Sequence, residues 1–115
     1  SGEITNHAIW NLPTSVNAWE MYLDGTPDLD AAPYAAASRA NDLSGLPPTY
    51  ICVGTEDLFR DEDIDYARRI SEAGAPCELA VFPGMYHAGE SFVPTAAVSR
   101  RMNQSIYAAA KSALE

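Results

Sequence analysis

Cysteine is scarce in this chain, and its two cysteines stand far apart in sequence. Cys52 and Cys77 each lie in an apolar run, so we expect small buried side chains in a reducing compartment such as the cytoplasm. Without a C-x-x-C motif or a Cys/His cluster, the sequence predicts no zinc site, and we expect neither a metal nor a cofactor. The chain begins at Ser1 without a methionine, which is typical of a cleaved or cloned boundary and is compatible with a removed targeting signal.

Long apolar runs and basic clusters are also missing. No run approaches the roughly 20 apolar residues that cross a bilayer, so no membrane span is predicted. Sixteen acidic residues against seven basic ones give a formal charge of -9, which argues against nucleic acid as a partner. The two Arg-Arg pairs, at 68–69 and 100–101, fall inside predicted helices and are interpreted as solvated faces.

The patterns that are present predict an α/β fold. Residues 49–53 and 77–82 are short β-rich runs, and the first suits a strand buried on both faces. Between them, Ile64, Ala67 and Ile70 form an apolar stripe behind an acidic first turn, which predicts a helix that ends at Gly74. A βαβ unit with parallel strands follows. Two strands are too few for a stable sheet, so we expect a piece of a larger one.

Two further segments frame this unit. Pro94 is expected in the first turn of a last helix, whose apolar face runs from Val98 to Ala113. Upstream, Thr14 or Ser15 is expected to cap a short helix that ends at Asp24-Gly25, before a long ordered connection. We therefore divide the chain into residues 1–48, the helix and connection, and residues 49–115, a βαβα portion of a parallel sheet.

Two loops leave the carboxyl ends of the predicted strands, where reactive groups collect in open parallel sheets. Neighbouring strands lie about 4.8 Å apart, so Asp57 and His87, four or five residues past their strands, can meet. An imidazole takes the proton of a serine hydroxyl and a carboxylate orients that imidazole, which is the chemistry of a catalytic triad. The order acid then histidine fits the last two places of the order nucleophile, acid, histidine.

The motifs around these two residues resemble the hormone-sensitive-lipase-like group of bacterial esterases, which have the α/β-hydrolase fold. The matching elements are Gly45-Leu46-Pro47-Pro48, Val53-Gly54-x-x-Asp57-x-x-x-Asp61-Glu62, Tyr66-Ala67-Arg68-Arg69 and Pro83-Gly84-x-x-His87. The resemblance implies that Asp57 is the triad acid and His87 the general base. The sequence also departs from the family at two points. Ala88-Gly89 replaces the usual Gly-Phe after the histidine, and neither a Gly-x-Ser-x-Gly elbow nor a His-Gly-Gly segment occurs.

Each candidate residue also has a plainer interpretation. Asp57 is also suited to bond its own loop backbone, and Glu56 is the rival acid. Ser91 is not expected to be a nucleophile, because its surroundings lack the final glycine of an elbow. His7 is expected to be structural or exposed. The aromatic residues near the site are expected to pack in the core rather than to stack on substrate; they are Trp10, Trp19, Tyr34 and Tyr86.

The resemblance implies the C-terminal part of a serine carboxylesterase that acts on small acyl esters through an acyl-enzyme. The serine and oxyanion hole are then expected N-terminal to Ser1, in the remainder of the hydrolase domain, and this chain alone is expected to be inactive. A homodimer through strand 77–82 is a further expectation. Two alternatives stay open: a non-catalytic assembly module or pseudoenzyme of the same fold, and a peptidase or other hydrolase with the same order of residues.

Overall fold

The computed structural model describes residues 9–25 and 34–115, so His7, Pro27 and Pro33 fall outside the described part. Along the chain, the helix α2 (Arg60–Glu72) comes between two strands, β1 (Thr49–Gly54) and β2 (Cys77–Phe82). The remaining elements are α1 (Leu12–Tyr22), the short 3-10 helix η1 (Ala37–Arg39), α3 (Gly89–Phe92) and α4 (Ala97–Leu114). None of the helices in the described part is long and apolar enough to cross a membrane.

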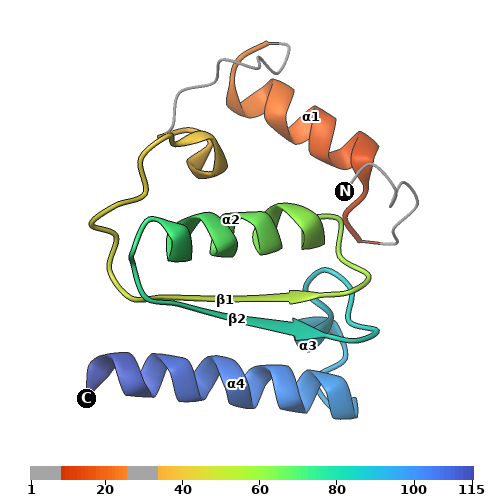
Figure 1. Cartoon of the computed structure of the whole chain (residues 1–115). Helices are drawn as coiled ribbons and strands as arrows, with labels where there is room; N and C mark the ends of the chain where they lie inside the picture. The colour runs from red at the N-terminus through yellow and green to blue at the C-terminus, as the bar shows by residue number, and fades with distance from the viewer. Residues whose placement is uncertain (1–8, 26–33) are drawn as a thin grey trace.

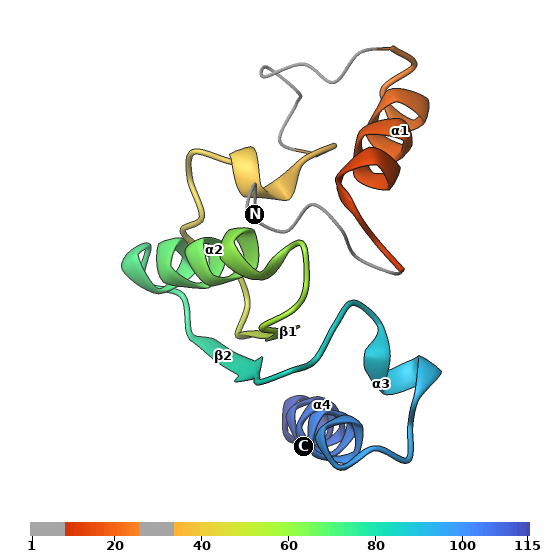
Figure 2. The ribbon, with the colours of Figure 1, turned by 90° about the vertical axis from the view of Figure 1, so that its right-hand side faces the viewer.

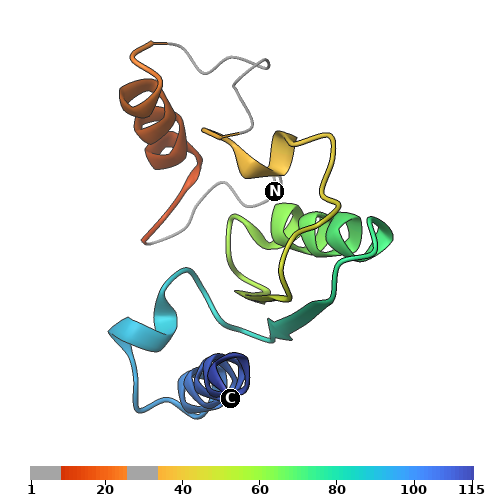
Figure 3. The ribbon, with the colours of Figure 1, turned by 90° about the vertical axis from the view of Figure 1, so that its left-hand side faces the viewer.

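The predicted βαβ unit is confirmed. β1 and β2 pair in parallel, with Thr49 opposite Cys77 and Gly54 opposite Phe82. α2 lies on one face of this pair and α4 on the other, which gives three layers (Figures 1, 2 and 3). Because both strands run the same way, their carboxyl ends and the loops that follow lie at one edge.

Two apolar clusters hold the layers together. One joins α2 to the connection before β1 through Leu43, Ile70 and Ala75. The other joins β2 and its following loop to α4 through Phe82, Met85 and Met102. Ile70 and Met85 are 0% and 2% exposed, so the end of α2 and the loop after β2 are firmly packed.

Two helix starts differ from the sequence prediction. α1 begins earlier, because the Asn11 side chain accepts a hydrogen bond from the Thr14 amide at 3.0 Å and Pro13 occupies the first turn. The predicted cap at Thr14 or Ser15 is therefore wrong. Pro94 does not open the last helix either: the separate short helix α3 ends at Phe92, and α4 begins at Ala97.

The burial of the sheet and of α2 also differs from expectation. In β1 only Val53 and Gly54 are buried, so the strand is not covered along both faces. Within the described residues each strand has one strand neighbour, and Leu79 of β2 is 37% exposed. On α2, Ile64 is also 37% exposed, whereas the buried stripe runs through Ala67 and Ile70.

Candidate functional site

The loop after β1 and the loop after β2 are tied together by hydrogen bonds. The Thr55 amide donates to the Phe82 carbonyl at 3.0 Å, and the Glu56 amide donates to the Met85 carbonyl at 2.9 Å. A side chain at Gly54 would place its Cβ 2.0 Å from that same Met85 oxygen. Glycine therefore permits the close approach of the two loops that carry Asp57 and His87.

Asp57 and His87 meet as the sequence predicted. The Asp57 Oδ2 lies 3.1 Å from the His87 Nδ1. The second oxygen, Oδ1, accepts a hydrogen bond from the Phe59 amide at 2.9 Å. The residue is 8% exposed, and both its oxygens have partners, so the carboxylate is held in one orientation. The local backbone bond and the contact with histidine, which the sequence offered as alternatives, thus occur together on different oxygens.

The imidazole of His87 is enclosed by aromatic rings on part of its surface. Its centroid lies 5.8 Å from the Trp10 ring and 5.6 Å from the Phe59 ring. The side chain is nevertheless 35% exposed. With a carboxylate facing Nδ1, the neutral ring carries its proton there, which makes Nε2 the acceptor. This arrangement suits a base that receives a proton on Nε2.

The other sequence candidates lie differently. Glu56 is exposed, and its side chain accepts a 3.3 Å hydrogen bond from the Thr55 hydroxyl rather than contacting His87. Ser91 is exposed on α3, where its hydroxyl bonds the neighbouring Glu90 at 3.4 Å. Tyr34 is fully exposed at 103%, so its expected packing role is wrong. Within residues 9–25 and 34–115 no group of three His, Cys, Asp or Glu side chains is arranged to hold a metal ion.

Asp63 is a residue near the site that the sequence analysis placed only among the acids that begin α2. It is half-buried and lines a hollow of about 320 Å³ together with Asp57 and His87. Burial, and then the charges of Asp57 and Glu62, raise its pKa to about 6, against a smaller lowering by His87. Helical spacing was the signal available, because Asp63, Ala67 and Ile70 are four and three residues apart and share the inner face.

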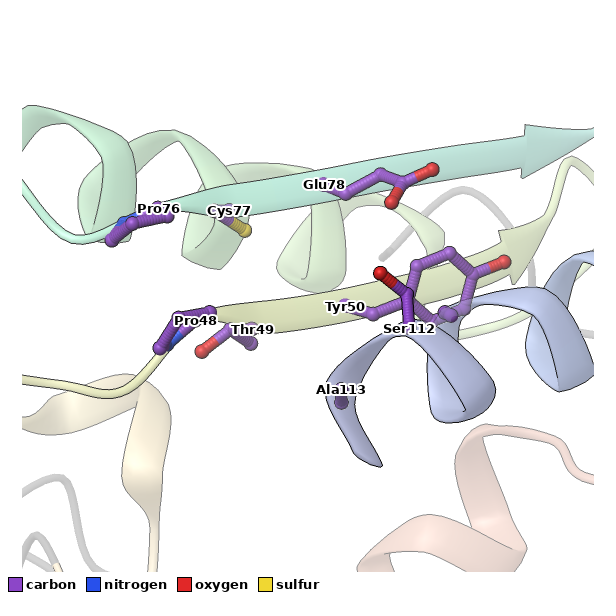
Figure 4. A pocket seen from close by; sticks show the side chains of 9 residues that line it. Pro48, Thr49, Tyr50, Pro76, Cys77, Glu78, Ser112 and Ala113 are labelled. Atoms are coloured by element: carbon purple, nitrogen blue, oxygen red, sulfur yellow. The ribbon is translucent and has the colours of Figure 1, made fainter. Parts of the chain in front are cut away.

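Among the other hollows of the described part, one lies beside α1 and one lies at the opposite end of the sheet. The first, of about 260 Å³, is almost wholly apolar, and α1 and the loop after β1 line it with Trp10, Ser15, Ala18, Trp19, Tyr22 and Phe59. The second, of about 570 Å³, lies at the amino ends of the strands between Pro48, Pro76 and the end of α4 (Figure 4). None of the described residues that line this second hollow is a histidine.

Comparison with known proteins places these observations in a family. A family model described as the α/β-hydrolase fold matches residues 1–90. Carboxylesterase NlhH of Mycobacterium tuberculosis is 36% identical over 83 residues, which are 70% of this chain and 26% of the relative. An acetyl-hydrolase of Streptomyces hygroscopicus is 33% identical over 82 residues, or 71% of this chain and 26% of the relative.

Solved structures give the same picture. A bacterial heroin esterase superposes with a TM-score of 0.81 at 41% identity, over 90% of this chain and 34% of that one. Esterase LipW from Mycobacterium marinum gives a TM-score of 0.81 at 34% identity, over 88% and 31% respectively. The chain thus spans about a quarter to a third of the length of these relatives. With the motifs and the parallel βαβ unit, the family match shows that the chain belongs to the α/β-hydrolase family, in its hormone-sensitive-lipase-like group.

Proposed function

We propose that this chain is the part of a serine carboxylesterase that supplies the triad acid, Asp57, and the general base, His87. The nucleophilic serine and the oxyanion hole then belong to residues outside this chain. The observation that carries the proposal is the 3.1 Å contact between Asp57 Oδ2 and His87 Nδ1, at the carboxyl edge of a parallel sheet. The names of the relatives, a carboxylesterase and an acetyl-hydrolase, support ester hydrolysis as the reaction.

The geometry supports a division of labour between the two residues. His87 Nε2 takes the proton of the serine hydroxyl as its oxygen attacks the ester carbonyl, and returns that proton to the departing alcohol. The acyl-enzyme is then hydrolysed by a water whose proton passes through the same nitrogen. Asp57 keeps the ring oriented and stabilises the imidazolium ion. Its low exposure and the hydrogen bond from the Phe59 amide hold the carboxylate in place for this role.

The substrate class that we propose is a small acyl ester. The almost wholly apolar hollow between α1 and Phe59 supports this choice, because Trp10 and Phe59 line it and also contact the His87 ring. An apolar acyl or alcohol group placed there would lie beside the base. This chain by itself is proposed to be inactive, because Ser91 is turned toward Glu90 and does not contact His87.

The decisive experiment measures hydrolysis of a chromogenic short-chain ester by the full-length protein that contains this chain. His87→Ala and Asp57→Asn are each expected to lower kcat by about a thousandfold or more, because the triad loses its base or the orientation of that base. The melting temperature of each variant checks that the fold is intact. A serine-directed phosphonate is expected to abolish turnover by the unaltered protein.

Glu56→Gln is the matched control, because it removes a carboxylate next to Asp57 that makes no contact with His87. Its kcat is expected to stay within about twofold of the unaltered protein, since an exposed charge adds little. Near-normal rates in His87→Ala or Asp57→Asn would overturn the proposal. Peptide turnover in place of ester turnover would favour the peptidase alternative, and a stable protein with neither activity would favour a pseudoenzyme.

A further inference from the structure

Asp63 differs from the other acids of α2 in where its carboxyl group lies. Asp61 pairs with Arg60 at 2.8 Å, and Asp65 pairs with Arg68 at 2.8 Å, both on the exposed side of the helix. The Asp63 side chain is half-buried and lines the hollow that contains Asp57 and His87. Within residues 9–25 and 34–115 no hydrogen bond or ion pair engages its carboxyl group. Such a half-buried acid lacks an obvious role in stability.

The position of Asp63 is determined by the packing of the inner face of α2. Ala67 and Ile70, four and seven residues later on the same face, are 3% and 0% exposed. The Asp63 amide donates to the Phe59 carbonyl at 2.9 Å, so the side chain projects from a regular first turn. The packed helix therefore fixes the position beside the hollow from which the Asp63 side chain projects.

The charges around this hollow come from several elements. The acids and the histidine are Asp57 and His87 from the two loops, Glu62 from α2 itself and Glu90 from α3, and the thiol of Cys52 and the hydroxyl of Tyr86 are the other titratable groups. None of the described residues that line this hollow is Lys or Arg, whereas Arg39 of η1 lines another hollow, of about 540 Å³, to which Asp63 also contributes. Among the described residues that line this hollow, His87 is the side chain that becomes a cation when it accepts a proton, and a negative Asp63 can stabilise that cation.

We propose that Asp63 is a second carboxylate of the His87 site, a positioning residue that stabilises the imidazolium ion from α2 while Asp57 orients the ring. This role rests on the proposed function, since it concerns the base of that reaction. Asp63 acts through His87 and is not expected to touch the ester. Its charge adds to that of Asp57, so the imidazolium formed during proton transfer faces two carboxylates rather than one.

The raised pKa of Asp63, about 6, supports this role in addition to the geometry. It implies that Asp63 is largely ionised at pH 8 and loses its charge in the range in which histidine usually gains one. The acid limb of a pH–rate profile that depends on the His87 base is therefore expected to respond to the charge of Asp63 as well. Removal of the Asp63 charge makes the imidazolium less favourable, so the neutral, active base persists to lower pH.

The test compares Asp63→Asn with the unaltered full-length protein in ester hydrolysis from pH 5 to pH 9. The midpoint of the acid limb of kcat/KM is expected to fall by about half a pH unit, as for partly exposed charges that line one hollow. At pH 8, kcat is expected to fall about threefold with KM unchanged. Asp65→Asn is the matched control, because it removes the same charge from the exposed face of α2, and its profile is expected to be unaltered.

An acid limb that stays in place or moves to higher pH in Asp63→Asn would overturn the proposal. So would an equal shift in Asp65→Asn, because it would show an effect of net charge alone. Asp63→Ser serves as a second variant where the amide fails to fold, with the same expected direction. A proton NMR titration of the His87 ring, assigned with His87→Gln, gives a readout that does not depend on turnover. A lower titration midpoint in Asp63→Asn than in the unaltered protein supports the role of Asp63, even in a protein without esterase activity. An unchanged midpoint overturns that role.

Discussion

Gly54→Ala is the substitution that most directly tests how the fold builds the site. A Cβ at this position would lie 2.0 Å from the Met85 carbonyl oxygen and 2.5 Å from the Met85 carbonyl carbon. Normal contact lies near 3.5 Å, so the two loops must part by about 1.5 Å. That movement breaks the 2.9 Å hydrogen bond from the Glu56 amide to the same oxygen.

The expected cost combines two effects. Overpacking in a well-packed region costs about 1 to 3 kcal/mol, and the loss of one hydrogen bond adds about 1 kcal/mol. We therefore expect the free energy of unfolding of the full-length protein to fall by about 2 to 4 kcal/mol. Asp57 and His87 lie three and two residues beyond the contact, so their 3.1 Å bond is expected to lengthen and kcat to fall by about a hundredfold.

Urea unfolding followed by circular dichroism gives the stability change, and ester hydrolysis gives kcat. Gly45→Ala is the control, because Gly45 has a φ of +74° and no neighbouring atom within 4 Å of an added Cβ. Backbone strain there is expected to cost about 1 kcal/mol and to leave kcat unchanged. A Gly54→Ala protein within about 0.5 kcal/mol of the original, with normal kcat, would refute the argument that the close approach of the loops builds the site.

Two further predictions concern the layers around the site. The Tyr50 hydroxyl lies 2.6 Å from the Ser105 hydroxyl and joins β1 to α4. Tyr50→Phe is therefore expected to lower the free energy of unfolding in urea by about 1 kcal/mol. A Tyr50→Phe, Ser105→Ala double variant is expected to lose no more than the sum of the losses in the two single variants. Asp63, whose folded pKa of about 6 exceeds the ordinary 3.8, binds its proton more tightly in the folded state, so the free energy of unfolding is expected to decline as pH rises from about 4 to above 6. Since water partly screens this half-buried carboxyl, we expect a decline of about 1 kcal/mol that is absent in Asp63→Asn; an equal decline in that variant would contradict the assignment.

The parallel βαβ unit could be predicted from sequence because its signals are local. Strand 77–82 matches β2 at both ends, since a β-rich apolar run is closed there by Pro83-Gly84. The meeting of Asp57 with His87 also follows, because parallel strands bring their carboxyl ends to one edge. The start of α1 was missed because the side chain of Asn11, three residues before Thr14, supplies the cap.

Other features depend on contacts between elements that sequence spacing does not reveal. The Trp10 and Phe59 rings come from separate segments, and only the folded chain brings both against His87. Tyr34 is exposed although its size favours burial, because the packing of its neighbours, not its own hydrophobicity, decides whether a surface is covered. Helical spacing places Asp63 on the inner face of α2, but its distance in sequence from His87 says nothing of their shared hollow.

By itself, the sequence determined the family, the order of strands and helices, and the two residues most suited to triad chemistry, because these depend on local patterns and on motifs of fixed spacing. Only the tertiary structure decided which atoms meet: Oδ2 of Asp57 with Nδ1 of His87, while Oδ1 bonds the Phe59 amide. It also decided that a second carboxylate, Asp63, lines the same hollow. The physical reason is that orientation and burial arise from packing between distant segments, in which one missing Cβ at Gly54 allows the loops to touch.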